Sequence, residues 1–265
     1  MDGLILAGWV AAILIGMTLA LIGAGGSILT VPVLVYLFGI PPVLATAYSL
    51  FVVGLTALAG SVSLIRKGAV RLPLVALFAA PSLLAVWLTR AWLLPSIPDP
   101  IWQSGSVVVG KDSFILILFA ALMLAASVSM IRNGNQEPSG TQRIRHGWIA
   151  LEGLIVGVLT GLVGAGGGFL IIPVLVLAAG LSMTEAVGTS LVIIAIKSLI
   201  GFTGDLGHQP VDWMFLATFS LLPLAGMAIG QRLVPYFNSQ HLKKAFGYFV
   251  LLTGSAMILV ELIRI

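Results

Sequence analysis

The sequence predicts an all-α membrane protein that crosses the bilayer several times, and three observations lead to this prediction. First, 59% of the residues are hydrophobic and only 8% are charged, whereas about a quarter of a typical soluble protein is charged. Second, the apolar residues form long runs between short polar connections, as transmembrane helices require. Third, the order of these runs in the first half recurs in the second. We therefore expect about eight transmembrane spans and two short half-helices, arranged as two inverted-topology repeats.

The first repeat, residues 1–131, is expected to contain five helical elements. A glycine-rich segment, Gly23 to Ser27, separates the first apolar run from a short one that ends before Pro41. The short run has about 11 residues, well below the roughly 20 needed to cross a bilayer, so we interpret it as a half-helix; the alternative is the tilted end of a broken helix. The expected elements cover residues 4–22, 28–38, 43–65, 72–94 and 113–131.

The second repeat, residues 148–265, follows the most polar stretch of the chain, residues 132–147, which we interpret as a cytoplasmic linker. Its first apolar run is broken by Gly164 to Gly168, and another short run follows. The expected elements cover residues 148–163, 169–179, 184–203, 213–230 and 245–263. Each repeat thus has the same five elements in the same order.

The two halves align residue by residue. With Gly16 placed on Gly157, no gap is needed through Gly60 and Gly201. The match is strongest between GAGGSILTVPVLV and GAGGGFLIIPVLV, which begin at Gly23 and Gly164. Chance does not produce such a run, so the sequence predicts an internal duplication.

The basic residues predict how each repeat faces the membrane. Three connections hold nine of the thirteen basic residues, and cytoplasmic loops carry an excess of Lys and Arg. The connections at residues 95–112 and 204–212 and both termini hold few basic residues, so we place them outside. Because each repeat has an odd number of elements, the second is expected to be inverted relative to the first. The basic residues are Arg66, Lys67, Arg71, Arg132, Arg143, Arg145, Arg232, Lys243 and Lys244.

Inverted repeats with short, Gly- or Pro-interrupted segments are typical of secondary transporters, which bind substrate between the repeats. Helices that begin inside the protein, expected here at Ser27/Ile28 and Gly168/Phe169, would direct free N–H groups and positive dipole ends at a shared centre. Such helix ends bind anions. The alternative is that these glycines only permit close helix crossing, as small residues do in membranes.

Hydroxyl groups and one lysine extend this candidate site. Ser49 and Ser190 occupy matching places in the repeats, with Thr189 beside the second, and could donate to a bound oxyanion. Membrane Ser and Thr otherwise bond to helix backbones. Lys197 lies deep in an expected span, which costs about 2.5–3.5 kcal/mol and usually marks a pathway or counter-ion. The alternatives are an interfacial position or a structural pair with Glu185 or Asp205. Arg90 and Arg232 lie at expected span ends, where an arginine needs no special role.

Several function classes are excluded. The chain has no cysteine, and we find no metal-ligand cluster, catalytic triad or nucleotide-binding loop. GAGG lacks the Lys-Ser/Thr of a phosphate-binding loop. We therefore expect neither an enzyme nor a cofactor or metal.

At the glycine breaks the chain resembles the sulfite exporter TauE/SafE family of membrane transporters, and the resemblance extends over nearly the whole chain. The motif is a Gly-rich break followed by an apolar run and a Pro-x-Leu, present twice as GAGGSILTVPVL and GAGGGFLIIPVL. AVGTSL, at residues 186–191, also resembles the family, whereas the first copy departs from it as ATAYSL. The resemblance implies a carrier for sulfur-containing anions such as sulfite or sulfonates, often working as an exporter.

We therefore expect a secondary transporter with alternating access in the bacterial inner membrane. Its partners would be a small anion, the lipid bilayer and a coupling proton or sodium ion, without nucleic acid; the oligomeric state is left open. The alternatives are an uncoupled anion channel and a carrier for a non-sulfur organic anion. The expected substrate-binding residues are Gly23, Gly25, Gly26, Ser27, Pro32, Ser49, Gly164, Gly166, Gly167, Gly168, Pro173, Thr189, Ser190 and Lys197.

Overall fold

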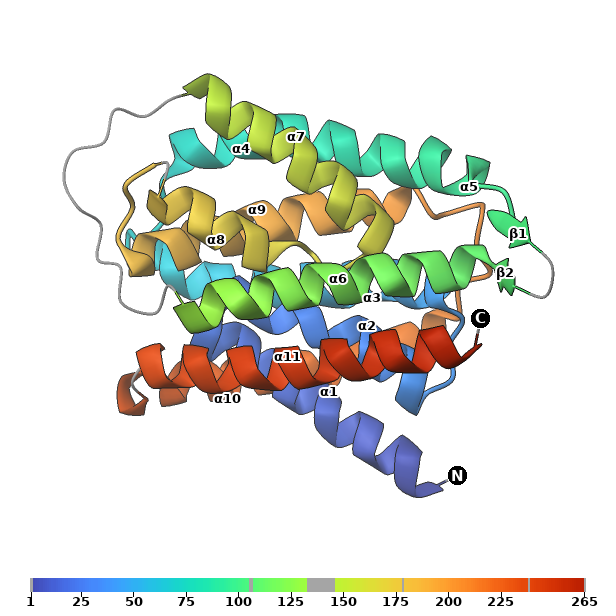
Figure 1. Ribbon diagram of the computed structural model, residues 1–265. Coiled ribbons are helices and arrows are strands. Elements are labelled where there is room, and N and C mark those ends of the chain that lie inside the picture. Colours follow the sequence, from blue (N-terminus) through green and yellow to red (C-terminus); the bar gives the residue numbers. More distant parts are fainter. Residues whose placement is uncertain (1, 105–106, 133–145, 178, 238, 265) are drawn as a thin grey trace.

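The computed structural model describes residues 2–104, 107–132, 146–177, 179–237 and 239–264 (Figure 1). Within these residues, seven helices are long and apolar enough to cross a membrane, and α7 (His146–Val163) is a shorter apolar helix. Large apolar side chains remain exposed on their outer faces, as lipid contact requires. The chain is therefore an all-α, multi-pass membrane protein, which confirms the predicted fold class.

The first half contains the five expected elements and one unexpected feature. The 95–112 connection, expected to be a loop, forms a short antiparallel pair, β1 (Trp102–Ser104) and β2 (Val107–Val109), with Trp102 opposite Val109. The helices are α1 (Asp2–Ile22), η1 (Gly23–Leu29), α2 (Thr30–Pro32), η2 (Val33–Leu37), α3 (Pro42–Arg66), α4 (Leu72–Leu88), η3 (Thr89–Leu93), α5 (Leu94–Ser96) and α6 (Lys111–Arg132).

The second half begins after the predicted linker, of which residues 133–145 lie outside the described residues. α9 starts with a capping box in which Ser182 and Glu185 exchange hydrogen bonds, and Asp212 caps α10 by accepting from Phe215 N. These polar residues satisfy N–H groups that a helix leaves free at its start. The helices are α7, α8 (Gly168–Leu177), α9 (Met183–Thr203), α10 (Trp213–Leu233), η4 (Val234–Tyr236) and α11 (Ser239–Arg264).

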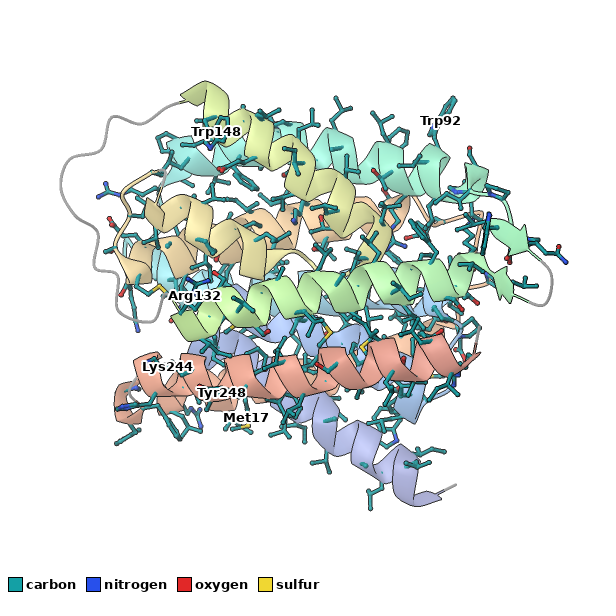
Figure 2. The ribbon with its side chains drawn as sticks, in the orientation of Figure 1. Met17, Trp92, Arg132, Trp148, Lys244 and Tyr248 are labelled. Atoms are coloured by element: carbon teal, nitrogen blue, oxygen red, sulfur yellow. The ribbon has the colours of Figure 1, made fainter. Side chains whose placement is uncertain are left out.

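The two ends of the helical body differ. We call the end that carries β1 and β2 the strand end; the start of α1 and the end of α11 also lie there (Figure 1). We call the opposite end, with the α3–α4 connection, the linker end. Arg132 and Lys244, from two of the basic connections, lie at the linker end (Figure 2). Exposed Trp92 and Trp148 lie near opposite ends of the body, as interfacial tryptophans do.

The first half-helix does not cross the molecule. After α1 the chain turns at Gly23, whose φ is +74°, and runs back along α1. Phe38 then packs edge-on against Trp9, with 5.3 Å between ring centroids. Because Trp9 lies in the second turn of α1, α1 and the segment up to Phe38 form a re-entrant pair that enters and leaves at the strand end.

The second half-helix forms a re-entrant pair from the opposite end. α7 starts next to the predicted linker, and α8 leads back to the start of α9. That start lies at the α3–α4 connection, because Thr189 Oγ1 accepts a 3.1 Å hydrogen bond from Arg71 N. The two pairs therefore enter the body from opposite ends.

The way the helices pack is also the same when the two halves are exchanged. α1 packs along α10 and α4 along α7, while α3 packs along α9 and α6 along α11. Exchanging each helix for its counterpart in the other repeat turns the first pairing into the second and leaves the others unchanged. α3 and α9 are the most buried spans, so the described core centres on them.

Candidate functional site

The two glycine breaks meet in the middle of the molecule. Ser27, in η1, donates a 2.6 Å hydrogen bond from Oγ to the carbonyl of Ala165 in the second break. Both residues are buried. The structure thus joins two segments that are 138 positions apart in the sequence.

The breaks differ in backbone conformation. In the second, Gly164, Gly166 and Gly167 all have positive φ, between +65° and +72°, and α8 begins at Gly168 as expected. In the first, Gly23 turns the chain and Gly25, Gly26 and Ser27 already belong to the 3-10 helix η1. The short apolar helix of this half covers Gly26–Leu37, so it starts within one residue of the expected Ser27/Ile28.

The second break is wedged between α3 and α9. A Cβ on Gly164 would collide with Thr46 of α3. A Cβ on Gly166 would lie 2.8 Å from Val53 of α3 and 3.3 Å from Ile194 of α9. Side chains are excluded here, so the backbone of the break itself lines the contact between the two central helices.

Lys197 lies beside this break. Its side chain is fully buried, and Nζ donates a 3.2 Å hydrogen bond to Thr160 Oγ1 of α7. A Cβ on Gly167 would lie 2.8 Å from Nζ, which places the ammonium group next to the residue that precedes α8. Lys197 therefore lies inside the protein, away from the membrane interface.

The alternative of a structural ion pair for Lys197 is wrong. Glu185 binds Arg71, with 2.6 Å between Oε1 and Nη2, and Asp205 pairs with Arg90. Each acid has another cation as its partner. No salt bridge involves Lys197 among the residues that the structure describes.

The predicted hydroxyl groups differ in whether they already have a hydrogen-bond partner. Ser49 is fully buried, and its Oγ has no hydrogen-bond partner among the described residues. Ser190 donates to the carbonyl of Val187 in its own helix, and Thr189 binds the α3–α4 connection. The structure thus places Thr189 at the α3–α4 connection, about two turns of α9 before Lys197. Pro32 ends α2 and Pro173 lies within α8, and neither side chain offers a polar group.

Ser198 was missed by the sequence interpretation. It is fully buried, its Oγ has no partner among the described residues, and a Cβ on Gly166 would lie 3.6 Å from that oxygen. Its counterpart in the repeat alignment is Ala57, which has no hydroxyl, so comparing the two repeats does not point to Ser198. Its position directly after Lys197 was the available clue.

Arg90 was also missed, because it was expected at a span end. It is fully buried in η3, and its Nη1 lies 3.0 Å from Thr46 Oγ1 and 3.3 Å from Asp205 Oδ1. Its repeat counterpart Arg232 is exposed. Asp205 follows the end of α9, and burial raises the pKa of its carboxyl while the Arg90 guanidinium opposes this.

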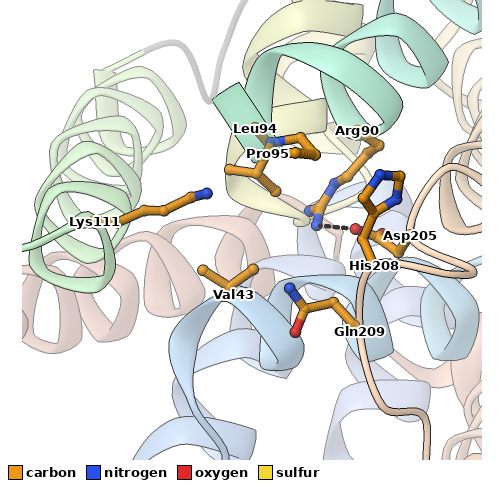
Figure 3. Close-up of a pocket in the computed structure, with 8 residues that line it drawn as sticks. All are labelled: Val43, Arg90, Leu94, Pro95, Lys111, Asp205, His208 and Gln209. Carbon is orange, nitrogen blue, oxygen red and sulfur yellow. Dashed lines mark hydrogen bonds and ion pairs between the residues drawn. The ribbon is translucent and has the colours of Figure 1, made fainter. Parts of the chain in front are cut away.

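A cavity of about 230 Å³ opens beside this ion pair at the strand end (Figure 3). Thr46 connects it to the second break, because Thr46 binds Arg90 and also touches Gly164. Polar groups therefore extend from the strand end to the centre. The cavity is lined by Val43, Arg90, Leu94, Pro95, Lys111, Asp205, His208 and Gln209.

Comparisons with known proteins agree with this architecture. The model of the family described as "Sulfite exporter TauE/SafE" matches residues 8–257. A "Probable membrane transporter protein" of Xylella fastidiosa strain 9a5c is 31% identical over 90% of this chain and 88% of its own length. "Probable membrane transporter protein YunE" of Bacillus subtilis is 26% identical over 78% of this chain and 80% of its own. No solved structure matches the chain. With a family match over nearly its whole length, the chain belongs to the sulfite exporter TauE/SafE family.

Proposed function

We propose that this protein is a secondary transporter that carries a small sulfur-containing anion, such as sulfite or a sulfonate, across the bacterial inner membrane, in the export direction. The substrate would bind between the glycine breaks, at Lys197. The family match and the names of the relatives support a transporter. The chemistry around Lys197 supports an anion.

The observation that carries the proposal is a buried lysine with no acidic partner among the residues that the structure describes. Lys197 is fully buried and bonds to a neutral hydroxyl, that of Thr160. A charge removed from water is costly unless an opposite charge or metal compensates it. Because Glu185 and Asp205 are paired with other residues, a bound anion is the natural partner for this ammonium group.

The start of α8 adds to the positive potential at the same place. α8 begins at Gly168, one residue beyond the position next to Lys197 Nζ. The first N–H groups of a helix lack intrahelical partners and carry partial positive charge. Ser49 and Ser198 add buried hydroxyl groups on the two central helices. Ammonium, helix start and hydroxyl groups together suit an oxyanion with several acceptor oxygens.

The paired re-entrant segments support alternating access. They enter from opposite ends and meet at the Ser27–Ala165 hydrogen bond, and helix packing is preserved when the halves are exchanged. In transporters with inverted repeats, movement of one half against the other opens a midplane site to each side in turn. We extend this mechanism to the present chain, with residues 1–131 and 148–265 as the two halves and both termini outside.

The test is flux in proteoliposomes for sulfite, small sulfonates, sulfate, carboxylates and chloride, each with and without a proton or sodium gradient. We expect saturable, gradient-dependent flux of a sulfur anion. Lys197→Met should reduce it at least tenfold while membrane insertion is retained. Lys67→Met, which removes an exposed lysine in the α3–α4 connection, is the matched control and should leave flux unchanged.

Other outcomes point to the alternatives. Flux that does not saturate and ignores both gradients would indicate an anion channel. Flux of carboxylates alone would indicate a carrier for a non-sulfur organic anion. Full flux in Lys197→Met would overturn the assignment of the binding site.

A further inference from the structure

The guanidinium group of Arg90 has one occupied side and one free side. Nη1 makes both of its contacts, with Thr46 Oγ1 and Asp205 Oδ1. Nε and Nη2 are buried and have no hydrogen-bond partner among the described residues. These two N–H groups form the parallel fork with which arginine binds two oxygens of one carboxylate, phosphate or similar oxyanion.

The free fork belongs to a side chain that lines the 230 Å³ cavity at the strand end (Figure 3). Lys111 reaches toward the same space from α6. The lining holds two basic side chains, Arg90 and Lys111, and one carboxylate, Asp205. Asp112 and Asp99 lie beside it, because they accept from Val43 N and Lys111 N of the lining. The unpartnered N–H groups of Arg90, rather than the net charge of the lining, therefore indicate an anion, and Gln209 adds an uncharged amide to the lining.

We propose that this cavity is a second anion-binding site, separate from Lys197, in which Nε and Nη2 of Arg90 bind two oxygens of a sulfur oxyanion or sulfonate. Asp205 competes with that anion for the guanidinium. The choice of ligand class rests on the proposed function, whereas the cavity and the free fork do not. In export, the site would receive anion from the glycine breaks along Thr46 and release it at the strand end.

Size and packing agree with this assignment. A water molecule occupies about 30 Å³ of liquid, so the cavity has room for a small oxyanion and part of its hydration shell. The Arg90–Asp205 contact is long for a charge-assisted hydrogen bond, 3.3 Å against a usual 2.7–2.9 Å. Asp205 Oδ2 also has no partner among the described residues. The pair is thus incompletely satisfied, and a bound anion would complete the contacts of Arg90.

The test is calorimetric binding of inorganic sulfate and methanesulfonate to the purified full chain in detergent. It is done in the Lys197→Met background, which removes the central site. The double change Arg90→Gln/Asp205→Asn replaces the ion pair without leaving a lone charge and should weaken binding at least tenfold. Asp205→Asn alone should strengthen binding several-fold, because it removes the competing carboxylate. Lys111→Met, which leaves the ion pair intact, should weaken binding several-fold.

Arg232→Gln is the matched control, because it removes an exposed arginine at the equivalent place in the other repeat, and should not change binding. Thermal melting of each variant checks that it is folded. Undiminished binding in the folded double variant, weaker binding in Asp205→Asn, or no binding in the Lys197→Met background would overturn the proposal. Binding here with no sulfur-anion flux in the wild-type protein would instead refute the proposed transport function alone.

Discussion

The hydroxyl of Ser27 donates a 2.6 Å hydrogen bond to the main-chain carbonyl of Ala165, which links the glycine break of one half to that of the other. The carbonyl lies in a non-helical turn within the protein, where an unsatisfied polar group is costly. This contact therefore couples the two re-entrant pairs at the place where the proposed substrate binds.

Ser27→Ala should lower the stability of the protein by about 1–3 kcal/mol, because it leaves a buried carbonyl unsatisfied. The measurement is the midpoint of thermal unfolding in detergent. Ser96→Ala is the control, since Ser96 is exposed and its hydroxyl donates to the carbonyl of Trp92 in its own turn. Equal midpoints for Ser27→Ala and the wild type would show that the link between the breaks contributes nothing.

Gly167→Ala should abolish most of the flux. Gly167 has φ +67°, which costs an L-residue about 1–2 kcal/mol, and the added methyl group would displace Thr160 and Lys197. Gly180→Ala separates these effects, because Gly180 has φ +66° but no neighbour within 4 Å of the added Cβ. We expect Gly180→Ala to transport normally after reconstitution. If both variants lose flux equally, backbone strain alone accounts for the loss.

Gly157→Val should destabilise the packing of α7 on α4. A Cβ at Gly157 would lie 2.6 Å from the carbonyl oxygen of Ser82 and 2.7 Å from Ala85 Cβ, and overpacking of this kind costs about 1–3 kcal/mol. Thermal melting again provides the measurement. Gly147→Val, in the same helix but with no atom within 4 Å of the new Cβ, should melt like the wild type. An unchanged midpoint for Gly157→Val would contradict the close crossing.

The predicted orientation can be tested directly, because the chain contains no cysteine. Gln103→Cys places a thiol in exposed β1 at the strand end, and Lys67→Cys places one in the α3–α4 connection at the linker end. We expect a membrane-impermeant maleimide to label Gln103→Cys in intact cells and Lys67→Cys only after permeabilisation. The reverse pattern would invert the proposed topology.

Much of the fold could be predicted from the sequence because each membrane helix can be recognised from its own residues. Each span is a long apolar run, and the glycine breaks at Gly23 and Gly164 interrupt two of them at matching places. The start of α8 at Gly168 followed from the same pattern. The backbone conformation of the first break did not, since nothing in the residues shows which of its glycines takes a left-handed φ, as Gly23 does. The β1–β2 pair was also missed, because strands of three residues give too short a pattern.

The site could be predicted from the sequence only in part, for a related reason. Lys197 stood out as a charge within an apolar run, and the structure places it beside Gly167. Arg90 looked like an ordinary span-end residue, and its burial depends on Asp205, which is 115 positions away. Thr189 matched the expected hydroxyl pattern, but the turn of α9 directs it to Arg71. Which face of a helix a polar residue occupies depends on its neighbours in space.

The sequence by itself determined that the chain is a multi-pass helical membrane protein with two glycine-broken segments, because the bilayer requires long apolar helices and makes any interruption conspicuous. Only the tertiary structure decided that the breaks fold back and meet, that Lys197 has no acidic partner within the described part of the chain, and that Arg90 lines a cavity. Those features depend on contacts between segments far apart in the chain, such as Ser27 with Ala165 and Arg90 with Asp205. Hydrophobic runs carry no information about such pairs, since all faces of a membrane helix can be equally apolar.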